Sequence, residues 1–259
     1  MNVMDTFRLD GKIALVTGGA GLYGVHISTA LAEAGATVLI ASRNEERCKS
    51  VAEELKAAGL QALAMNLNLC EESSIIETRD MILKEFGRLD VLFNNAVARA
   101  GGNIDHMTRQ EWESTMVVNS TGLFLCCQLF GDEMAKRRSG SIVNICSIYG
   151  VVGPDFTIYE NTPIQNPANY SFAKGGMVNF TRYLASFYGK FSIRVNCISP
   201  GGYYTGQHPE FVQKYCRNTP LGRMANSEDI KGPAVFLASD ASAYITGHNL
   251  MVDGGWTAI

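Results

Sequence analysis

A short apolar segment near the N-terminus, followed by a glycine-rich turn and a helix, restricts the fold of this chain more than any other feature. Residues 12–17 (Lys-Ile-Ala-Leu-Val-Thr) show no polar alternation, which is typical of a strand covered on both faces in a parallel sheet. Residues 18–24 (Gly-Gly-Ala-Gly-Leu-Tyr-Gly) then lead into a helical stretch that ends before Gly35. Such glycines can serve a tight turn alone. The strand before them and the helix after them favour a phosphate site, because the helix N-terminus offers free amides and a partial positive charge.

The remaining sequence repeats this alternation of strands and helices up to the C-terminus. Hydrophobic residues make up 46% of the chain and charged residues 18%, which is sufficient for a large core. No linker, repeat or low-complexity segment interrupts the pattern, so we expect a single α/β domain over residues 1–259. Further strands are expected at residues 37–41, 61–67, 90–93, 141–146, 192–198 and 249–252, and further helices at 44–58, 71–86, 108–137, 170–188 and 227–238.

The composition excludes several classes of protein. The net charge of −3 offers no general attraction to nucleic acid or to an anionic membrane. We find no secretory signal and no uncharged apolar run of membrane-spanning length, so we expect a cytoplasmic protein. The seven cysteines are odd in number and form no Cys-x-x-Cys pair, and the four histidines are scattered. This pattern predicts buried, reduced thiols and no metal site.

The residues after the second expected strand bear on the choice of dinucleotide. An acidic side chain at this position would bind the ribose hydroxyls of NAD. The chain instead has Ser42-Arg43-Asn44, in which a hydroxyl and a planar cation suit the 2′-phosphate of NADP. A solvated arginine on a surface loop is the alternative. We therefore favour NADP(H) as the cofactor and leave NAD(H) open.

Polar residues also follow the third and fourth expected strands and interrupt one helix. Asn68 follows the third strand, and Asn94-Asn95-Ala96-Val97 follows the fourth. Asparagines at a strand end can bind the backbone and hold a turn open beside a cofactor. Asn119 and Gly122 lie inside the helical region 108–137, and both disfavour a regular helix. They predict a kink with a polar role at this point, or a simple junction between two helices.

Three further residues, Ser147, Tyr170 and Lys174, have side chains that suit acid–base chemistry. Ser147 lies at the end of a strand, at the sheet edge where open α/β folds bind their ligands. A polar loop, residues 148–169, separates it from Tyr170 and Lys174, which are four residues apart on one helical face. The Lys174 ammonium would lower the pKa of Tyr170, so that the phenol could exchange a proton with an alcohol oxygen near neutral pH. An exposed helical pair without a function is the alternative.

Together these landmarks resemble the short-chain dehydrogenase/reductase family over essentially the whole chain. They are, in order, Thr17-Gly18…Gly24, Asn94-Asn95-Ala96, Asn119, Ser147, Tyr170…Lys174, Pro200-Gly201…Thr205 and Val252-Asp253-Gly254-Gly255. The resemblance implies a Rossmann-type, doubly wound parallel sheet of seven strands with helices on both faces. It also implies an NAD(P)-dependent enzyme that interconverts a secondary alcohol and a ketone.

The resemblance further implies roles for individual residues. Tyr170 would be the general acid/base, Lys174 would tune it and bind the nicotinamide ribose, and Ser147 would hold the substrate oxygen. Asn119 would support a water that connects Lys174 to solvent. The residues that match cofactor contacts are Gly18, Gly21, Leu22, Tyr23, Gly24, Ser42, Arg43, Asn68, Leu69, Asn95, Ala96, Tyr170, Lys174, Pro200, Gly201, Tyr203 and Thr205.

The chain departs from the family pattern at Asn68, where the family usually has aspartate, and in three further places. Leu22 replaces the middle glycine of the turn, with Gly21 one place early, and Val97 replaces the glycine that usually follows Asn-Asn-Ala. The spacing of 23 positions between Ser147 and Tyr170 is longer than is common in the family. This part of the chain looks like bacterial sugar-modification and gluconate-type members of the family. The polar content of the loop favours a polyhydroxylated substrate such as a sugar or sugar acid, since the loop contains Asp155, Tyr159, Glu160, Asn161, Thr162, Gln165 and Asn166.

Three functions stay open on the sequence. The leading hypothesis is an NADP(H)-linked oxidoreductase that acts on a polar, carbohydrate-like compound. A 3-oxoacyl thioester reductase is the second, although the polar loop suits an acyl chain poorly. A non-catalytic NADP sensor is the third, although a pure binder needs no acid/base pair. Residues 202–225 resemble a substrate lid, and the apolar C-terminal residues 250–259 with Trp256 predict a homo-oligomer, with a tetramer expected.

Overall fold

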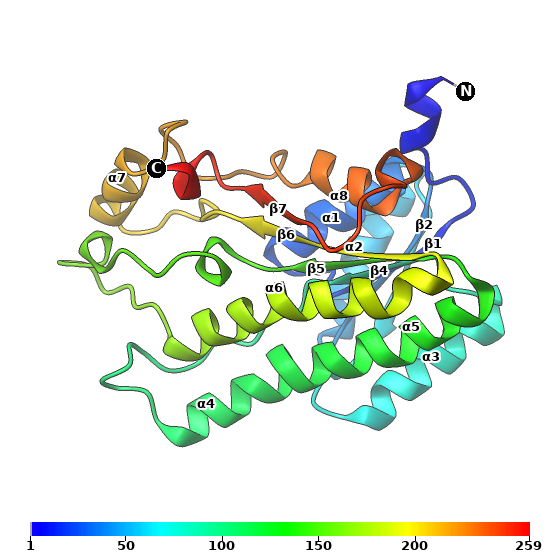
Figure 1. Cartoon of the computed structure of the whole chain (residues 1–259), viewed down its shortest axis with the longest axis horizontal. Coiled ribbons are helices and arrows are strands. Elements are labelled where there is room, and N and C mark those ends of the chain that lie inside the picture. Colours follow the sequence, from blue (N-terminus) through cyan, green and yellow to red (C-terminus); the bar gives the residue numbers. More distant parts are fainter. Residues whose placement is uncertain (1) are drawn as a thin grey trace.

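The computed structural model describes residues 2–259, which form a seven-stranded parallel sheet between two layers of helices (Figure 1). The strand order is β3-β2-β1-β4-β5-β6-β7. The chain builds one half of the sheet outward from β1 and then returns to build the other half from β4, so a topological switch point lies between these two strands. The predicted single-domain, doubly wound fold is confirmed. The strands are β1 (Ile13–Thr17), β2 (Thr37–Ser42), β3 (Ala62–Asn66), β4 (Val91–Asn94), β5 (Gly140–Ile145), β6 (Ile193–Pro200) and β7 (Asn249–Val252).

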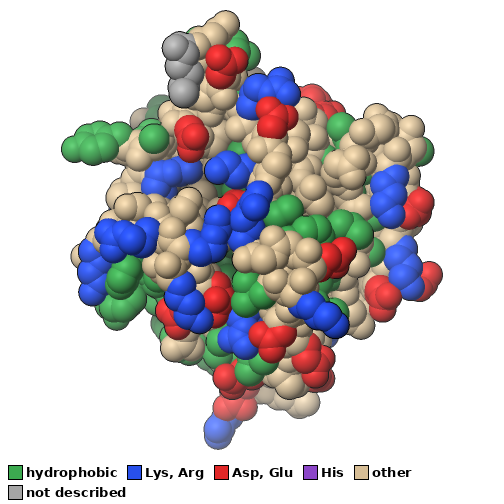
Figure 2. Space-filling model, turned by 90° about the vertical axis from the view of Figure 1, so that its right-hand side faces the viewer, with side chains coloured by type: hydrophobic (Ala, Val, Ile, Leu, Met, Phe, Trp, Pro, Cys, Tyr) green, Lys and Arg blue, Asp and Glu red, His purple; other side chains and the backbone are tan. Residues whose placement is uncertain are grey.

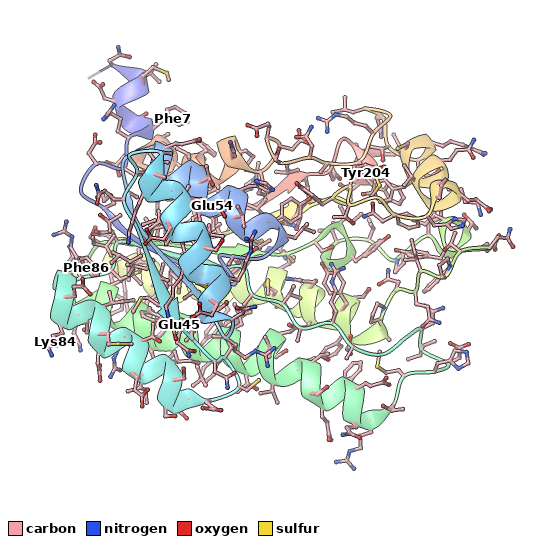
Figure 3. The ribbon with its side chains drawn as sticks, turned by 180° about the vertical axis from the view of Figure 1, so that it is seen from behind. Phe7, Glu45, Glu54, Lys84, Phe86 and Tyr204 are labelled. Atoms are coloured by element: carbon pink, nitrogen blue, oxygen red, sulfur yellow. The ribbon has the colours of Figure 1, made fainter. Side chains whose placement is uncertain are left out.

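Helices cover both faces of the sheet. One layer consists of α1 (Leu22–Glu33), α2 (Glu45–Ala57) and α8 (Lys231–Ala238), and the other of α3 (Glu72–Phe86), α5 (Leu123–Arg137) and α6 (Ala168–Tyr188). In Figure 3, seen from behind, α2 lies nearest the viewer with the labelled Glu45 and Glu54 along it. Two further α-helices complete the set: α4 (Arg109–Met116) precedes α5, and α7 (Pro209–Arg217) lies beside the C-terminal ends of the strands (Figure 1).

Strand β1 shows why the sequence of this sheet is apolar without alternation. Successive side chains of a strand point to opposite faces. Ile13 and Leu15 therefore enter the core beneath α3, α5 and α6, whereas Ala14 and Val16 enter the core beneath α1, α2 and α8. All five residues of β1 are buried. A strand that feeds two cores has no solvent-facing side, which is the arrangement that its composition predicts.

The helical region predicted at 108–137 is interrupted as its asparagine and glycine indicate. It begins with a capping box between Thr108 and Glu111, and α4 and α5 are joined by a π-helical segment, Val117–Gly122. Such widened turns leave the regular hydrogen-bond pattern and are frequent at functional sites. Asn119 lies in this segment and is buried.

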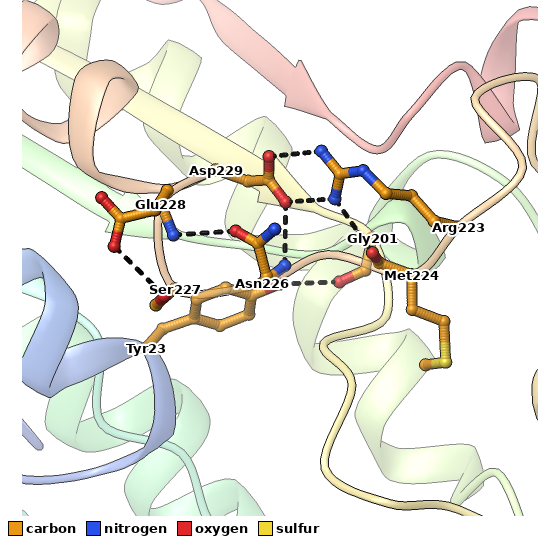
Figure 4. Close-up of polar contacts among 8 residues, drawn as sticks. All are labelled: Tyr23, Gly201, Arg223, Met224, Asn226, Ser227, Glu228 and Asp229. Carbon is orange, nitrogen blue, oxygen red and sulfur yellow. Dashed lines mark hydrogen bonds and ion pairs between the residues drawn. The ribbon is translucent and has the colours of Figure 1, made fainter.

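The start of α8 differs from the sequence prediction. The helix begins at Lys231 rather than at residue 227, because residues 226–230 form a turn around the carboxylate of Asp229 (Figure 4). Asp229 accepts hydrogen bonds from the Asn226 backbone N–H (2.8 Å) and from both terminal nitrogens of Arg223 (2.6 and 2.7 Å). These bonds satisfy the backbone outside a helix, so the helical pattern starts later.

The N-terminal ends of the strands form the face shown in Figure 2, where basic side chains gather near the middle. Asp90, which precedes β4, is buried at this edge. It accepts hydrogen bonds from the Ile13 N–H (2.9 Å), from Arg88 (3.0 Å) and from Arg137 (3.3 Å). One carboxylate thus ties together the beginnings of β1 and β4 and the end of α5.

The predicted burial of the cysteines is confirmed for five of the seven. All seven are free; five are buried, Cys216 is partly exposed, and Cys70 lies on the surface. Over residues 2–259, none of the helices combines the length and the apolar character that a bilayer crossing needs.

Candidate active site

A cavity of about 750 Å³ opens at the C-terminal ends of the strands, at the switch point between β1 and β4. Its volume lies within the range of pockets that hold cofactors and small molecules. Every predicted site residue lines this cavity except Gly24 and Asn119, which lie directly behind its wall. The lining includes Gly18, Gly21, Leu22, Tyr23, Ser42, Arg43, Asn68, Leu69, Asn95, Ala96, Ser147, Tyr170, Lys174, Pro200, Gly201, Tyr203 and Thr205.

The glycine-rich turn has the tight geometry that a phosphate site requires. A Cβ atom on Gly24 would lie 2.1 Å from the carbonyl oxygen of Gly18, so no larger residue fits there without moving the turn. Gly18 itself has a left-handed backbone with φ of 61°. The Asn95 side chain donates to the same Gly18 oxygen (2.9 Å) and to that of Thr17 (3.1 Å). Asn95 thereby joins the loop after β4 to the turn after β1.

The beginning of α1 faces this turn and is open to an anion. Its N-cap residue, Gly21, makes no side-chain capping bond, so the first amides of the helix keep their donors. Leu22 is the first residue of α1, and its side chain is exposed. A leucine is therefore compatible with this position, because the backbone there is already helical and needs no glycine.

One end of the cavity contains the residues after β2 and β3. Arg43 is exposed and lines the cavity, and across residues 2–259 its side chain takes part in no ion pair or hydrogen bond. Ser42 is less free, since its hydroxyl contacts the Asn44 backbone and the Cys48 thiol. Asn68 bonds Glu71 (2.8 Å), which holds its amide at the cavity edge beside Leu69.

At the other end of the cavity, Tyr170 and Lys174 lie one helical turn apart on α6, as predicted. The Lys174 Nζ atom is 5.7 Å from the centre of the Tyr170 ring and donates to the Ile145 carbonyl oxygen at 2.6 Å. Lys174 is only 3% exposed, so this bond fixes an ammonium inside the protein. Ser147, which follows β5, lies across from them and also lines the cavity.

A second cation, Arg99, contacts Tyr170 and was missed by the sequence analysis. Its guanidinium carbon lies 4.6 Å from the centre of the Tyr170 ring. Burial by itself raises the pKa of Tyr170, but the charges of Lys174 and Arg99, together with hydrogen bonds from Ser147 and Arg99, outweigh it. The pKa of Tyr170 is therefore lowered, in the direction predicted from Lys174 alone.

The side chain of Asn119 fixes the backbone of Ala98, the residue before Arg99. The side chain of Asn119 accepts from the Ala98 N–H (2.8 Å) and donates to the Ala98 carbonyl (2.9 Å). Both polar atoms of this amide are thus used by the residue before Arg99. The side chain thereby fixes the loop after β4, while its expected support of a water beside Lys174 stays a prediction. The only feature of the sequence that points to Arg99 is that a basic residue stands shortly after the end of the strand expected at 90–93.

The loop 148–169 and residues 202–225 form one cover over the substrate end of the cavity. They share a small core made of Ile148, Ile158, Phe211, Tyr215, Met224 and Trp256. Trp256 stacks on Tyr215 with ring centres 4.4 Å apart and is buried in its own subunit. Trp256 therefore packs within its own subunit and gives no support to the predicted oligomer.

The polar residues of the loop separate into two groups. Tyr159, Gln165 and Asn166 line the cavity, as the sequence analysis expected. Two others bond residues 202–225 instead: Asp155 accepts from Asn218 (2.8 Å), and Asn161 donates to Glu210 (3.4 Å). Tyr203 and Thr205, at the other side of the cover, line the cavity, and Tyr203 contacts His26 of α1 (3.0 Å). Tyr23 of α1 donates to the Gly201 carbonyl at 3.0 Å (Figure 4).

The sequence of this chain is similar to a family model and to proteins of known function. A family model described as enoyl-(acyl carrier protein) reductase matches residues 21–257. The 5-keto-D-gluconate 5-reductase of Escherichia coli (strain K12) is 34% identical over 257 residues, which cover 97% of each chain. A 3-oxoacyl-[acyl-carrier-protein] reductase of Aquifex aeolicus (strain VF5) is 36% identical over 253 residues, covering 96% of this chain and 98% of that protein.

A solved structure is similar along its full length. The gluconate 5-dehydrogenase from Burkholderia cenocepacia J2315, crystallised in complex with NADP and tartrate, superposes with a TM-score of 0.91 at 30% identity, with 100% of each chain covered. These full-length relatives indicate the same family as three features of the structure: the sheet order, the glycine turn and the Ser147–Tyr170–Lys174 arrangement. The chain belongs to the short-chain dehydrogenase/reductase family of NAD(P)-dependent oxidoreductases.

Proposed function

We propose that this protein is an NADP(H)-linked oxidoreductase that interconverts a secondary alcohol and a ketone on a polar, carbohydrate-like small molecule. The observation that carries the proposal is Tyr170 at the edge of the cavity, with its pKa lowered by Lys174 and Arg99. A phenol tuned in this way suits proton exchange with an alcohol oxygen. A protein that merely senses NADP would gain nothing from this arrangement.

The cavity residues fit NADP(H). The Gly18–Gly24 contact leaves no room for a Cβ atom, and the uncapped N-terminus of α1 suits the pyrophosphate. The unpaired cation of Arg43 suits a 2′-phosphate. When bound, the nicotinamide accepts or supplies the hydride. Lys174 would hold the nicotinamide ribose, and the similar gluconate 5-dehydrogenase was crystallised with NADP.

The proton steps are assigned to three side chains. In the oxidative direction, the Tyr170 phenolate would take the proton of the substrate hydroxyl while the hydride leaves its carbon. Ser147 would donate to the same substrate oxygen and hold it against Tyr170. Lys174 and Arg99 would stabilise the phenolate before the proton moves. In the reductive direction the neutral Tyr170 would return the proton to the carbonyl oxygen.

The substrate end of the cavity supports a polar compound. Tyr159, Asn166 and Arg99 line it and offer polar groups to a substrate, beside the apolar side chains of Ile164, Phe211 and Met224. The relatives named for 5-keto-D-gluconate and gluconate point to the same class. The relative named for a 3-oxoacyl-[acyl-carrier-protein] supports the alternative, a 3-oxoacyl thioester reductase. Residues 202–225 would close over the bound substrate as a lid.

We also propose a homo-oligomer, a tetramer, in the cytoplasm. Large apolar side chains are exposed along α5 and α6, namely Phe124 (45%), Phe172 (61%), Tyr183 (64%) and Phe187 (47%). Such a surface suits pairing between copies of the chain. The free thiols suit a reducing compartment. Sedimentation that gives a monomer at micromolar concentration would contradict the assembly.

A substrate screen tests the proposed function. Purified protein is mixed with NADPH and either 5-keto-D-gluconate, other keto-sugars or a 3-oxoacyl thioester, and NADPH absorbance is followed. We expect the highest kcat/KM with a polyhydroxylated ketone, and loss of that turnover in Tyr170→Phe. A higher kcat/KM with the thioester would favour the alternative, and no turnover of any compound would contradict the enzyme assignment.

A further inference from the structure

Three polar side chains of the loop 148–169 form a hydrogen-bonded group that the proton steps do not use. The hydroxyls of Tyr149 and Tyr159 are 2.7 Å apart, and the Asn166 side chain contacts the Tyr159 hydroxyl at 3.3 Å. All three residues line the cavity. We refer to Tyr149, Tyr159 and Asn166 as the Tyr-Tyr-Asn group.

The Tyr-Tyr-Asn group is held close to the reacting centre. The backbone N–H of Tyr149 donates to the Ser147 hydroxyl at 3.2 Å. The next residue, Gly150, packs so tightly against α6 that a Cβ atom there would lie 2.6 Å from the Lys174 carbonyl oxygen. Tyr149 thus has a fixed position relative to Ser147 and Lys174.

Helix α7 and Asn103 fix the other side of the Tyr-Tyr-Asn group. The ring of Tyr159 packs against that of Phe211 of α7, with the ring centres 5.4 Å apart. Lys214 of α7 donates a hydrogen bond to the Glu160 carbonyl at 2.9 Å. Asn166 is 6% exposed, and its backbone N–H bonds the Asn103 side chain at 3.1 Å. These contacts pre-organise the three polar ends before any ligand arrives, which lowers the cost of binding one.

Hydrogen-bond accounting shows that the Tyr-Tyr-Asn group is incomplete by itself. Each phenol carries one donor hydrogen and the amide carries two. The group shares two internal contacts, which use one donor each. Two donors therefore remain, whichever way the Asn166 amide is turned, and within residues 2–259 no other side chain or carbonyl accepts them. Burial raises the pKa of both phenols, so they keep their protons as donors.

We propose that the Tyr-Tyr-Asn group binds a second oxygen-bearing substituent of the substrate, a hydroxyl or carbonyl oxygen on a carbon near the one that reacts. The inference rests on the proposed function, and it narrows the substrate class to compounds with adjacent oxygen functions, such as keto-polyols and keto-sugar acids. A site built to bond such an oxygen discriminates strongly against analogues that lack it, because its buried donors are then left unpaired.

The test compares two ketones and two matched variants. The probes are 5-keto-D-gluconate, which has neighbouring hydroxyls, and 2-butanone, which has none. Tyr159→Phe removes one hydroxyl and keeps the ring against Phe211. Tyr204→Phe is the control, because Tyr204 is exposed and outside the cavity lining but lies near the same end of the molecule (Figure 3). The kcat/KM of each ketone is measured by NADPH absorbance, and NADPH affinity by fluorescence.

We expect Tyr159→Phe to lower the ratio of kcat/KM for 5-keto-D-gluconate over 2-butanone by about 10–10²-fold, mainly through KM, with NADPH affinity preserved. Tyr204→Phe should keep the wild-type ratio. An unchanged ratio in Tyr159→Phe overturns the proposal while leaving the proposed function intact, and so does a wild-type preference for 2-butanone. A wild-type protein that reduces neither ketone contradicts the proposed function itself.

Discussion

Replacement of Arg99 by methionine tests how the charge around Tyr170 is arranged. Methionine keeps a long apolar side chain and removes the cation that lies 4.6 Å from the centre of the Tyr170 ring. Two unit charges about this far apart interact by about 0.9 kcal/mol in water and by about 3.6 kcal/mol at the effective dielectric constant of a protein surface. Because Arg99 is exposed, the lower part of this range applies.

The expected shift follows from these energies. Loss of this stabilising interaction should raise the pKa of Tyr170. The direction is upward, because removal of a positive charge disfavours the phenolate. Alcohol oxidation requires the phenolate as base, so its rising limb should move to higher pH by the same amount.

The assay is the pH profile of kcat/KM for alcohol oxidation in the wild type, Arg99→Met and Arg99→Lys. The lysine variant restores a cation and should recover much of the wild-type profile. A profile that does not move in Arg99→Met would refute the assignment of Arg99 to Tyr170. An equal shift in both variants would show that the shape of the arginine, and not its charge, is responsible.

Three further substitutions test the cofactor turn and the scaffold. Arg43→Ala should weaken NADPH by about 1.5–3 kcal/mol in a fluorescence titration and leave NADH nearly unchanged, whereas equal losses for both would contradict a 2′-phosphate contact. Gly24→Ala places a Cβ atom 2.1 Å from the Gly18 oxygen, so we expect a loss of about 1–3 kcal/mol of unfolding free energy and weaker binding of both cofactors; wild-type stability and affinity would refute this. Asp90→Ala leaves the Ile13 N–H and Arg88 without their acceptor and should cost about 2–3 kcal/mol in urea unfolding, and a change near zero would show that water replaces the carboxylate.

The strands and the principal site residues were predictable from the sequence because their causes are local. A strand such as β1 is apolar throughout because both of its faces are buried. Tyr170 and Lys174 meet because residues four apart share a helical face. Ser147 reaches the cavity because the end of β5 lies at the edge of the sheet where ligands bind.

Arg99 could not be predicted because its position depends on a distant contact. The loop after β4 is fixed by Asn119, which lies 21 positions from Ala98 and bonds both of its backbone groups. The sequence indicates that Asn119 interrupts a helix, but the partner of its amide depends on how α4, α5 and the sheet edge pack. The cation over Tyr170 is a consequence of that packing.

The loop 148–169 was predicted to be polar and close to the site. Which of its polar residues line the cavity depends on tertiary structure. Tyr159 and Asn166 reach the cavity, whereas Asp155 and Asn161 bond residues 202–225. Trp256 was assigned to a subunit contact because it lies in an apolar C-terminal segment, but Tyr215 of α7 covers it. In both cases the deciding neighbour is α7, and no local pattern in the loop or the C-terminal segment indicates where that helix lies.

The central claim is that Tyr170 is the proton donor and acceptor, and Tyr170→Phe tests it most directly. The variant removes the hydroxyl and keeps the ring beside Arg99. In steady-state measurements with the best ketone of the screen, we expect kcat to fall by about 10²–10⁴-fold, while NADPH affinity and the unfolding midpoint stay near the wild-type values. The fall should persist across the pH range, because the group that titrates is gone. A Tyr170→Phe enzyme that keeps near-normal kcat would contradict the account, since the proton would then pass through another group.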